Sequence, residues 1–190
     1  MAQTHFTRLQ MLTIISGSNR KGNYTLIFAQ YIYELIRDTM DIPVKMLDLV
    51  TIDSAIIHEA MYQEDQQAPG VIQIQNDYFQ QAEKLWFFVP EYNGSYPGIL
   101  KLLIDAISVR DYAGTFGSKK ACVTGVASGR AGNLRGMDHL ADVLNHLNIA
   151  VLPNKQPISS IHGLLDQHKK LQDKGMKEAL QAQMDEFLKF

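Results

Sequence analysis

Short runs of apolar residues alternate along the chain with longer segments in which apolar residues recur every three or four positions. An unbroken apolar run is typical of a strand buried in a parallel sheet, and the periodic pattern is typical of an amphipathic helix. Strands are therefore expected at residues 11–16, 44–47, 84–89, 119–126 and 149–151. Helices are expected at residues 24–40, 70–82, 97–108, 132–146 and 165–188.

Strands and helices that alternate in this way predict an α/β fold with a doubly wound, five-stranded parallel sheet. The expected strand order is 2-1-3-4-5, as in flavodoxin-like proteins, and it leaves a crevice at the carboxyl ends of strands one and three. With 190 residues and no internal repeat, the chain is expected to form a single domain over residues 1–190, in which residues 1–10 are an N-terminal extension. The long polar connection at residues 49–69 is expected to be functional or interfacial.

Composition narrows the class of protein. Apolar residues make up 46% and charged residues 20% of the chain, as in ordinary globular proteins. A net charge of −2 gives no indication of a nucleic-acid partner, and no apolar run is long enough to span a membrane. The polar first ten residues do not resemble a signal peptide, and the lone Cys122 cannot form an internal disulfide. We therefore expect a cytoplasmic protein.

The loop at residues 16–25 follows the first expected strand and predicts a phosphate site. Gly17 and Gly22 permit tight turns and let an anion approach the backbone closely, because glycine has no Cβ. The residues after Gly22 are not the Lys-Ser/Thr of a nucleotide-triphosphate loop, and Asn19 stands where the dinucleotide fingerprint requires glycine. These two common nucleotide motifs are therefore excluded.

Polar side chains in the same loop suit a phosphate at the start of the next helix. Ser18, Asn23 and Thr25 offer short side-chain donors. The free N–H groups and the positive dipole end of the helix favour a dianion. Arg20 adds a planar, permanently charged group that matches phosphate oxygens. The alternative is an ordinary turn in which Arg20 and Lys21 are solvated.

The loop at residues 90–98 follows the third expected strand and suits a flat ring with a polar edge. Pro90 ends the strand because it cannot donate to the ladder, and Pro97 suits the first turn of the next helix. An aromatic face, amide groups and a flexible backbone come together at Tyr92, Asn93, Gly94 and Ser95. The alternative is a turn whose tyrosines cap the core. Both loops should open at the same edge of the sheet, so that together they predict a flavin mononucleotide (FMN) site.

With these loops the chain resembles the NADPH-dependent FMN reductase family, a flavodoxin-like group that includes azoreductases, quinone reductases and chromate reductases. The resemblance covers about residues 10–150. Its matching stretches are Gly17-Ser18-Asn19-Arg20 with Asn23 and Thr25, Pro90 to Lys101 with Ile104-Asp105, and the weaker Ala127 to Gly132. The family usually has serine where this chain has Asn23, although the asparagine amide can still donate a hydrogen bond.

The resemblance implies an NAD(P)H-dependent oxidoreductase that passes hydride through bound FMN to a quinone, an azo compound, a metal oxyanion or free flavin. The flavin would carry the chemistry, so neither a catalytic side chain nor a metal is expected. The family also implies a homodimer or homotetramer. Whether the reductant is NADPH or NADH stays open, since the candidate cations for a 2′-phosphate are Arg20, Lys21, Arg110 and Arg130.

The residues expected to bind the cofactor are Gly17, Ser18, Arg20, Asn23, Tyr24, Thr25, Pro90, Glu91, Tyr92, Asn93, Gly94, Ser95, Ser128 and Gly129. Two other functions remain open. A flavodoxin-type electron carrier would bind FMN without reacting with a nicotinamide, but such carriers are usually strongly acidic, unlike this chain. The second alternative is a non-catalytic flavodoxin-like binding or sensor protein. It stays open because Asn23 departs from the serine that the family usually has at this position.

Overall fold

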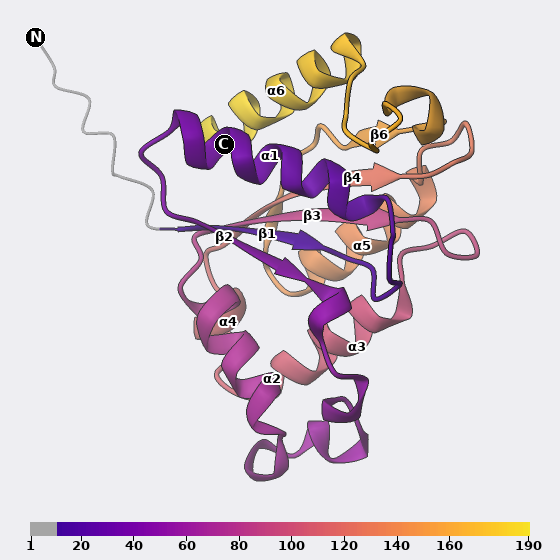
Figure 1. Cartoon of the computed structure of the whole chain (residues 1–190). Helices are drawn as coiled ribbons and strands as arrows, with labels where there is room; N and C mark the ends of the chain where they lie inside the picture. The colour runs from indigo at the N-terminus through magenta and orange to yellow at the C-terminus, as the bar shows by residue number, and fades with distance from the viewer. Residues whose placement is uncertain (1–10) are drawn as a thin grey trace, which may run out of the picture.

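The computed structural model describes residues 11–190, and the expected extension at residues 1–10 lies outside them. Its central feature is a parallel β-sheet between two layers of helices (Figure 1). The strands are β1 (Leu12–Ser16), β2 (Val44–Asp48), β3 (Lys84–Pro90), β4 (Lys120–Val126), β5 (Ala150–Val151) and β6 (Gln156–Ile158). The flavodoxin-like order β2-β1-β3-β4-β5 confirms the prediction.

The helices lie on both faces of the sheet. They are α1 (Thr25–Thr39), α2 (Pro69–Ile74), α3 (Gly98–Ile107), α4 (Tyr112–Phe116), α5 (Leu134–His146) and α6 (Lys174–Lys189). The expected helix at residues 70–82 is only partly α-helical, because α2 continues as a π-helical turn, Gln75–Gln80. The connection at residues 49–69 contains a series of short 3₁₀ turns, and the short helix α4 was not expected.

The sheet has a sixth strand, so the prediction of five strands is wrong at one edge. β5 pairs with the first two residues of β4, and β6 pairs with the last three residues of the same strand. The edge is therefore built in two pieces on either side of residues 152–155. Pro153 and Pro157 interrupt the apolar pattern there, and proline is tolerated at a sheet edge because its missing N–H is not needed for a ladder.

Alternate residues of the strands point to opposite faces, and each face has its own core. Trp86 and Phe88 of β3 pack in one cluster with Phe28 of α1 and Phe187 of α6. Phe87, between them in sequence, lies in the opposite cluster with residues of α2, α3 and α5. All five aromatic side chains are fully buried. The carboxyl end of β3 is thereby held firmly from both faces.

Helix α6 is shorter than the expected helix at residues 165–188, because residues 165–171 form a hairpin instead. Lys169 has a φ of 58°, in the left-handed region that does not continue a helix. Asp173 then caps α6, since its side chain accepts the N–H of Met176 at 2.7 Å. The prediction is wrong for the first part of this segment and holds for the apolar stripe that follows.

Candidate cofactor site

A cavity of about 520 Å³ opens where β1, β3 and β4 end. Four segments line it, at residues 20–25, 90–92, 126–129 and 161–162. The first three belong to the loops singled out in the sequence, whereas the fourth follows β6 and was not expected. The volume is typical of sites that bind small organic ligands.

The expected cofactor-binding residues divide into two groups. Those that line the cavity are Arg20, Asn23, Tyr24, Thr25, Pro90, Glu91, Tyr92, Ser128 and Gly129. Those that do not line it are Gly17, Ser18, Asn93, Gly94 and Ser95. The second group shapes the two loops that the first group presents to the cavity.

Gly17 and Ser18 fix the loop after β1 against β3 and its own loop. The N–H of Gly17 donates to the carbonyl of Phe88 at 2.8 Å, and a Cβ at position 17 would lie only 3.0 Å from the same oxygen. Only glycine fits this close approach without a shift of the backbone. The buried Ser18 Oγ lies 2.5 Å from the hydroxyl of Tyr92 and also accepts the N–H of Arg20 at 3.2 Å. Ser18 therefore ties the two site loops together.

Asn23 closes the loop after β1 and caps α1. Its Oδ1 accepts the N–H of Leu26 at 3.0 Å, and its Nδ2 donates to the carbonyl of Arg20 at 2.8 Å. Among residues 11–190, the N–H groups of Tyr24 and Thr25 have no acceptor. Both residues line the cavity at the positive end of the α1 dipole, which is the arrangement that binds an anion.

The loop after β3 is a tight hairpin whose tip residues do not line the cavity. Tyr92 and Ser95 exchange two backbone hydrogen bonds, of 2.9 and 3.1 Å. Asn93 and Gly94 between them have φ values of 52° and 79°, as a type I′ turn requires. Ser95 Oγ lies 3.0 Å from Nδ1 of His139 on α5. These residues hold Tyr92 in place, and the turn accounts for the Asn-Gly pair.

Aromatic side chains and cations meet at the mouth of the cavity. The guanidinium of Arg20 lies 5.8 Å from the centre of the Tyr92 ring. Tyr24 meets His162 edge to face, with ring centres 5.0 Å apart, and the ammonium of Lys169 lies 5.5 Å from the Tyr24 ring. His162 was missed because its position depends on β6, which the sequence pattern did not indicate.

The third loop contributes backbone groups. The N–H groups of Ser128 and Gly129 have no acceptor within the described part of the chain, and both residues line the cavity. The two more distant candidates for a 2′-phosphate contact, Arg110 and Arg130, are not brought to the cavity. Arg110 instead donates to the side chains of Gln75 and Asn76.

The residues present fit FMN at both ends of the molecule. Free N–H groups at the start of α1, with Arg20 and Lys21 beside them, suit a phosphate dianion. Free N–H groups of the third loop and the rings of Tyr24 and Tyr92 suit a flat ring with a polar edge. Within residues 11–190, no helix is long and apolar enough to cross a membrane, and no three metal-ligating side chains come together.

Comparison with known proteins agrees with this chemistry. The family model described as NADPH-dependent FMN reductase matches residues 11–163. An NAD(P)H-dependent FMN reductase of Pseudomonas aeruginosa is 32% identical over 174 residues, which are 90% of this chain and 89% of that protein. A quinone reductase of Escherichia coli is 27% identical over 145 residues, 76% of this chain and 74% of that protein.

A solved structure confirms the fold. The flavoenzyme NAD(P)H:(acceptor) oxidoreductase FerB from Paracoccus denitrificans superposes with a TM-score of 0.74 at 17% identity, over 95% of this chain and 96% of that one. The match of a family model to most of the chain, together with a relative above 30% identity, establishes the relationship. The chain belongs to the NADPH-dependent FMN reductase family and is an FMN-dependent NAD(P)H oxidoreductase.

Proposed function

We propose that the enzyme reduces a small quinone, with FMN held in the cavity at the carboxyl ends of β1, β3 and β4. The observation that carries the proposal is the pair of free N–H groups at Tyr24 and Thr25, beside Arg20, at the end of a cavity that Tyr92 also lines. A phosphate at this helix start and a ring toward the loops after β3 and β4 would use every free donor described above.

In this proposal, the loop after β1 binds the phosphate. Tyr24 and Thr25 donate their backbone N–H groups, and Arg20 and Lys21 supply positive charge. Ser18 acts through Tyr92, because its hydroxyl is engaged by the tyrosine rather than turned into the cavity. From the sequence, Ser18 was expected to donate to the phosphate, and we propose that it instead positions Tyr92, whose hydroxyl its Oγ contacts.

The loops after β3 and β4 orient the ring. The N–H groups of Ser128 and Gly129 are free to meet polar atoms at its edge, where negative charge grows on reduction. The chemistry that bound FMN supplies is the relay of a hydride from NAD(P)H to a second acceptor. The net reaction transfers that hydride and a proton from solvent to the quinone, giving hydroquinone and NAD(P)⁺.

An anaerobic absorbance titration tests the function. The purified protein should show flavin bands near about 370 and 450 nm, which bleach on adding NADPH and return on adding a quinone. An azo compound and a metal oxyanion serve as parallel acceptors. Bands that persist with NADPH would indicate an electron carrier, and a colourless protein that takes up no FMN would overturn the proposal. Faster return of the bands with the azo compound would reassign the acceptor.

We further propose a homodimer or homotetramer in the cytoplasm. Support for self-association comes from four large hydrophobic side chains that are exposed within residues 11–190: Tyr62, Leu102 on α3, Tyr112 on α4 and Leu134 on α5. Light scattering measures the oligomeric state directly. Support for a reducing compartment comes from Cys122, which is a free, buried thiol in β4 and has no second cysteine in this sequence to pair with. Cell fractionation tests the compartment.

A further inference from the structure

A second cavity, of about 500 Å³, runs beside the cofactor cavity along the first turns of α1. We define it as the α1 groove, lined by α1 residues from Leu26 to Glu34, by Lys169, Lys170 and Leu171, and by Lys177 of α6. Asn23 lines both cavities, so that the groove begins where the cofactor cavity ends. A single extended ligand can therefore occupy parts of both.

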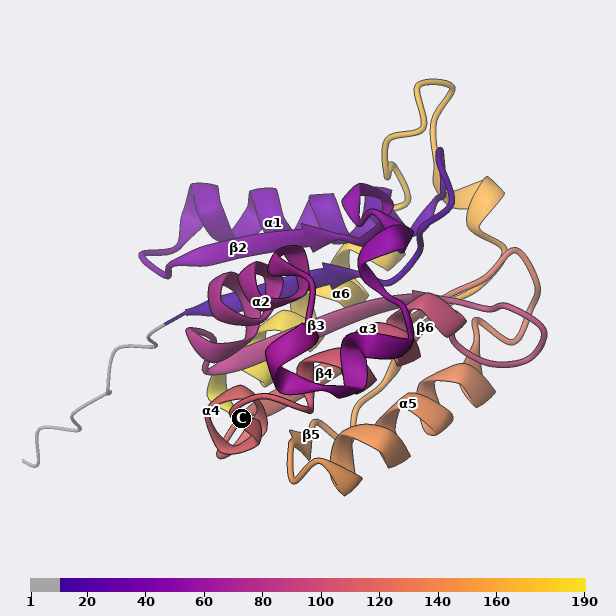
Figure 2. The same ribbon diagram turned by 90° about the horizontal axis from the view of Figure 1, so that it is seen from below.

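The hairpin at residues 165–171 forms one wall of the α1 groove and lies beyond residues 11–163, which match the family model. Figure 2 shows the segment before α6 standing beside the loop that follows β1. The Asp166 carboxylate accepts the N–H groups of His168 and Lys170, both at 2.8 Å, and the N–H of Lys169 donates to the Asp166 carbonyl at 2.9 Å. The hairpin therefore presents its two lysines from a defined backbone.

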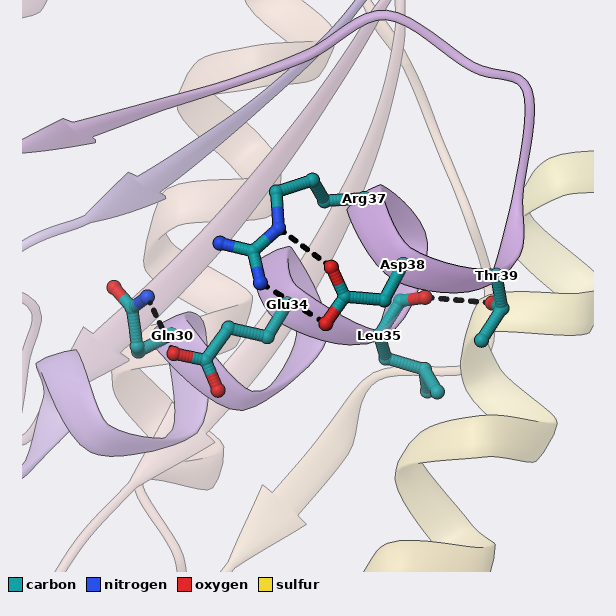
Figure 3. Close-up of polar contacts among 6 residues, drawn as sticks. All are labelled: Gln30, Glu34, Leu35, Arg37, Asp38 and Thr39. Atoms are coloured by element: carbon teal, nitrogen blue, oxygen red, sulfur yellow. Dashed lines mark hydrogen bonds and ion pairs between the residues drawn. The ribbon is translucent and has the colours of Figure 1, made fainter.

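Positive charge dominates the groove. Lys169, Lys170 and Lys177 line it, and within the described residues none of them forms an ion pair. The one carboxylate in the lining, Glu34, accepts a hydrogen bond of 2.9 Å from Gln30 one turn earlier on α1 (Figure 3). Three ammonium groups against one carboxylate, already bonded to its neighbour, favour an anionic ligand.

The rest of the lining is apolar or aromatic. Leu26 and Ile27 of α1 line the groove together with Leu171 of the hairpin, and Tyr31 adds an aromatic ring. A flat heterocycle can lie against such a surface while a phosphate on it meets the lysines. The groove therefore combines a place for a ring with a place for a doubly charged group.

We propose that the α1 groove binds the adenosine 2′-phosphate end of NADPH and so makes the enzyme prefer NADPH to NADH. Lys170 and Lys177 would meet the 2′-phosphate, and the apolar lining would meet the adenine. The proposal rests on the NAD(P)H oxidoreductase function, which supplies the dinucleotide. It also replaces Arg110 and Arg130, the distant arginines considered from the sequence, neither of which reaches either cavity.

Calorimetry on the FMN-loaded protein tests the proposal without relying on turnover. The probes are adenosine 2′,5′-bisphosphate and adenosine 5′-monophosphate, which differ only by the 2′-phosphate. Wild-type protein should bind the bisphosphate at least about tenfold more tightly, the usual effect of one hydrogen bond to a charged group. Lys170→Ala and Lys177→Ala should each weaken the bisphosphate by about tenfold and leave the monophosphate unchanged.

Lys174→Ala is the matched control, because Lys174 lies on the same helix, pairs with Glu178 and does not line the groove. It should change neither affinity. Equal binding of the two probes to wild-type protein would overturn the proposal, as would groove variants that behave like the control. If either result is found while NADPH and NADH still reduce FMN at similar rates, the oxidoreductase function stands and only the α1 groove proposal fails. Failure of the protein to take up FMN would instead contradict the oxidoreductase function itself.

Discussion

At the scale of a single residue, Arg20 contacts both of the loops that form the cofactor site. Its N–H is bonded to Ser18, its carbonyl accepts the amide of Asn23, and its guanidinium lies over the edge of the cavity near Tyr92. The backbone of Arg20 therefore serves the loop while its side chain stays free for a ligand. A substitution that shortens the side chain should affect binding far more than folding.

We expect Arg20→Ala to weaken FMN binding by about 1.5–3 kcal/mol, the usual contribution of a hydrogen bond to a charged group. This corresponds to roughly a 10- to 150-fold rise in the dissociation constant, measured by fluorescence titration of the apoprotein. Arg130→Ala is the control, since Arg130 is a neighbouring loop arginine outside the cavity lining. A titration curve for Arg20→Ala that overlays the wild-type curve would remove Arg20 from the site.

A second residue-scale expectation concerns the thiol of Cys122. Burial raises its pKa well above the ordinary value of 9.0, and the side chain is fully inaccessible in β4. Native protein should therefore resist a disulfide-exchange reagent such as DTNB at pH 8, whereas protein in guanidinium should react at once with one equivalent. Rapid reaction of the native protein would show that β4 opens locally.

At the scale of elements, the site depends on where α1 starts. Asn23 supplies the capping oxygen, and its amide closes the preceding loop, so that the departure from the family's serine preserves the helix start. Serine is an equally good capping residue, because its hydroxyl can accept the same N–H. The presence of asparagine in place of serine at position 23 therefore leaves the N–H groups of Tyr24 and Thr25 free to bind an anion.

Removal of this cap should destabilise the protein. Asn23→Ala is expected to lower the free energy of unfolding by about 0.5–2 kcal/mol, as for other lost caps, while Asn23→Ser should stay close to wild type. Urea denaturation followed by circular dichroism measures both variants. If serine costs as much as alanine, the contact to the Arg20 carbonyl, and not the cap, stabilises the loop.

The hairpin before α6 should respond to acid through Asp166. Hydrogen bonds from the N–H groups of Lys170 and His168 hold the pKa of Asp166 below its ordinary value of 3.8. Because the pKa is lower in the folded state, the stabilising contribution is complete above about pH 3.8 and is lost as the pH falls through the lowered value. The amide resonance of Lys170 should shift with a midpoint below 3.8, and Asp166→Asn should abolish that transition. A midpoint at or above 3.8 would contradict this account.

At the scale of the whole molecule, α6 closes one face of the sheet. Phe187 is fully buried against Trp86, with ring centres 5.7 Å apart, and it lies in the same cluster as α1. The stripe that places it there was evident in the sequence. Because α1 and α6 share this core, a substitution that disrupts the packing of α6 should also disturb the start of α1 and the cofactor cavity.

Phe187→Ala should lower the free energy of unfolding by about 3–5 kcal/mol, as for other buried phenylalanines. Asp185→Ala, on the exposed side of the same helix, should change it by less than about 0.5 kcal/mol. Urea unfolding of the two variants, with FMN and without it, provides the comparison. A small effect of Phe187→Ala would mean that α6 is dispensable for this core.

The parts of the molecule that the sequence predicted are those governed by local patterns. Unbroken apolar runs identified β1, β3 and β4, and the loops after them fell at the expected edge of the sheet. β6 was missed because Pro157 breaks a run of only three paired residues. The hairpin at residues 165–171 was mistaken for helix because Leu171 fits the helical stripe, whereas Asp173 marks the true start. His162 reaches the cofactor cavity, and Lys169 reaches the α1 groove, only through these long-range pairings, which the periodicity of the sequence does not reveal.

The two-piece edge formed by β5 and β6 limits how another chain can pair with this sheet. A long, unbroken edge strand presents a row of free N–H and C=O groups that a second molecule can extend, and this is a common route to aggregation. Here that row is cut into segments of two and three residues, with prolines at positions 153 and 157. Strand addition is therefore disfavoured at this edge, where self-association would have to use helix faces, whereas the opposite edge is β2, an unbroken strand of five residues.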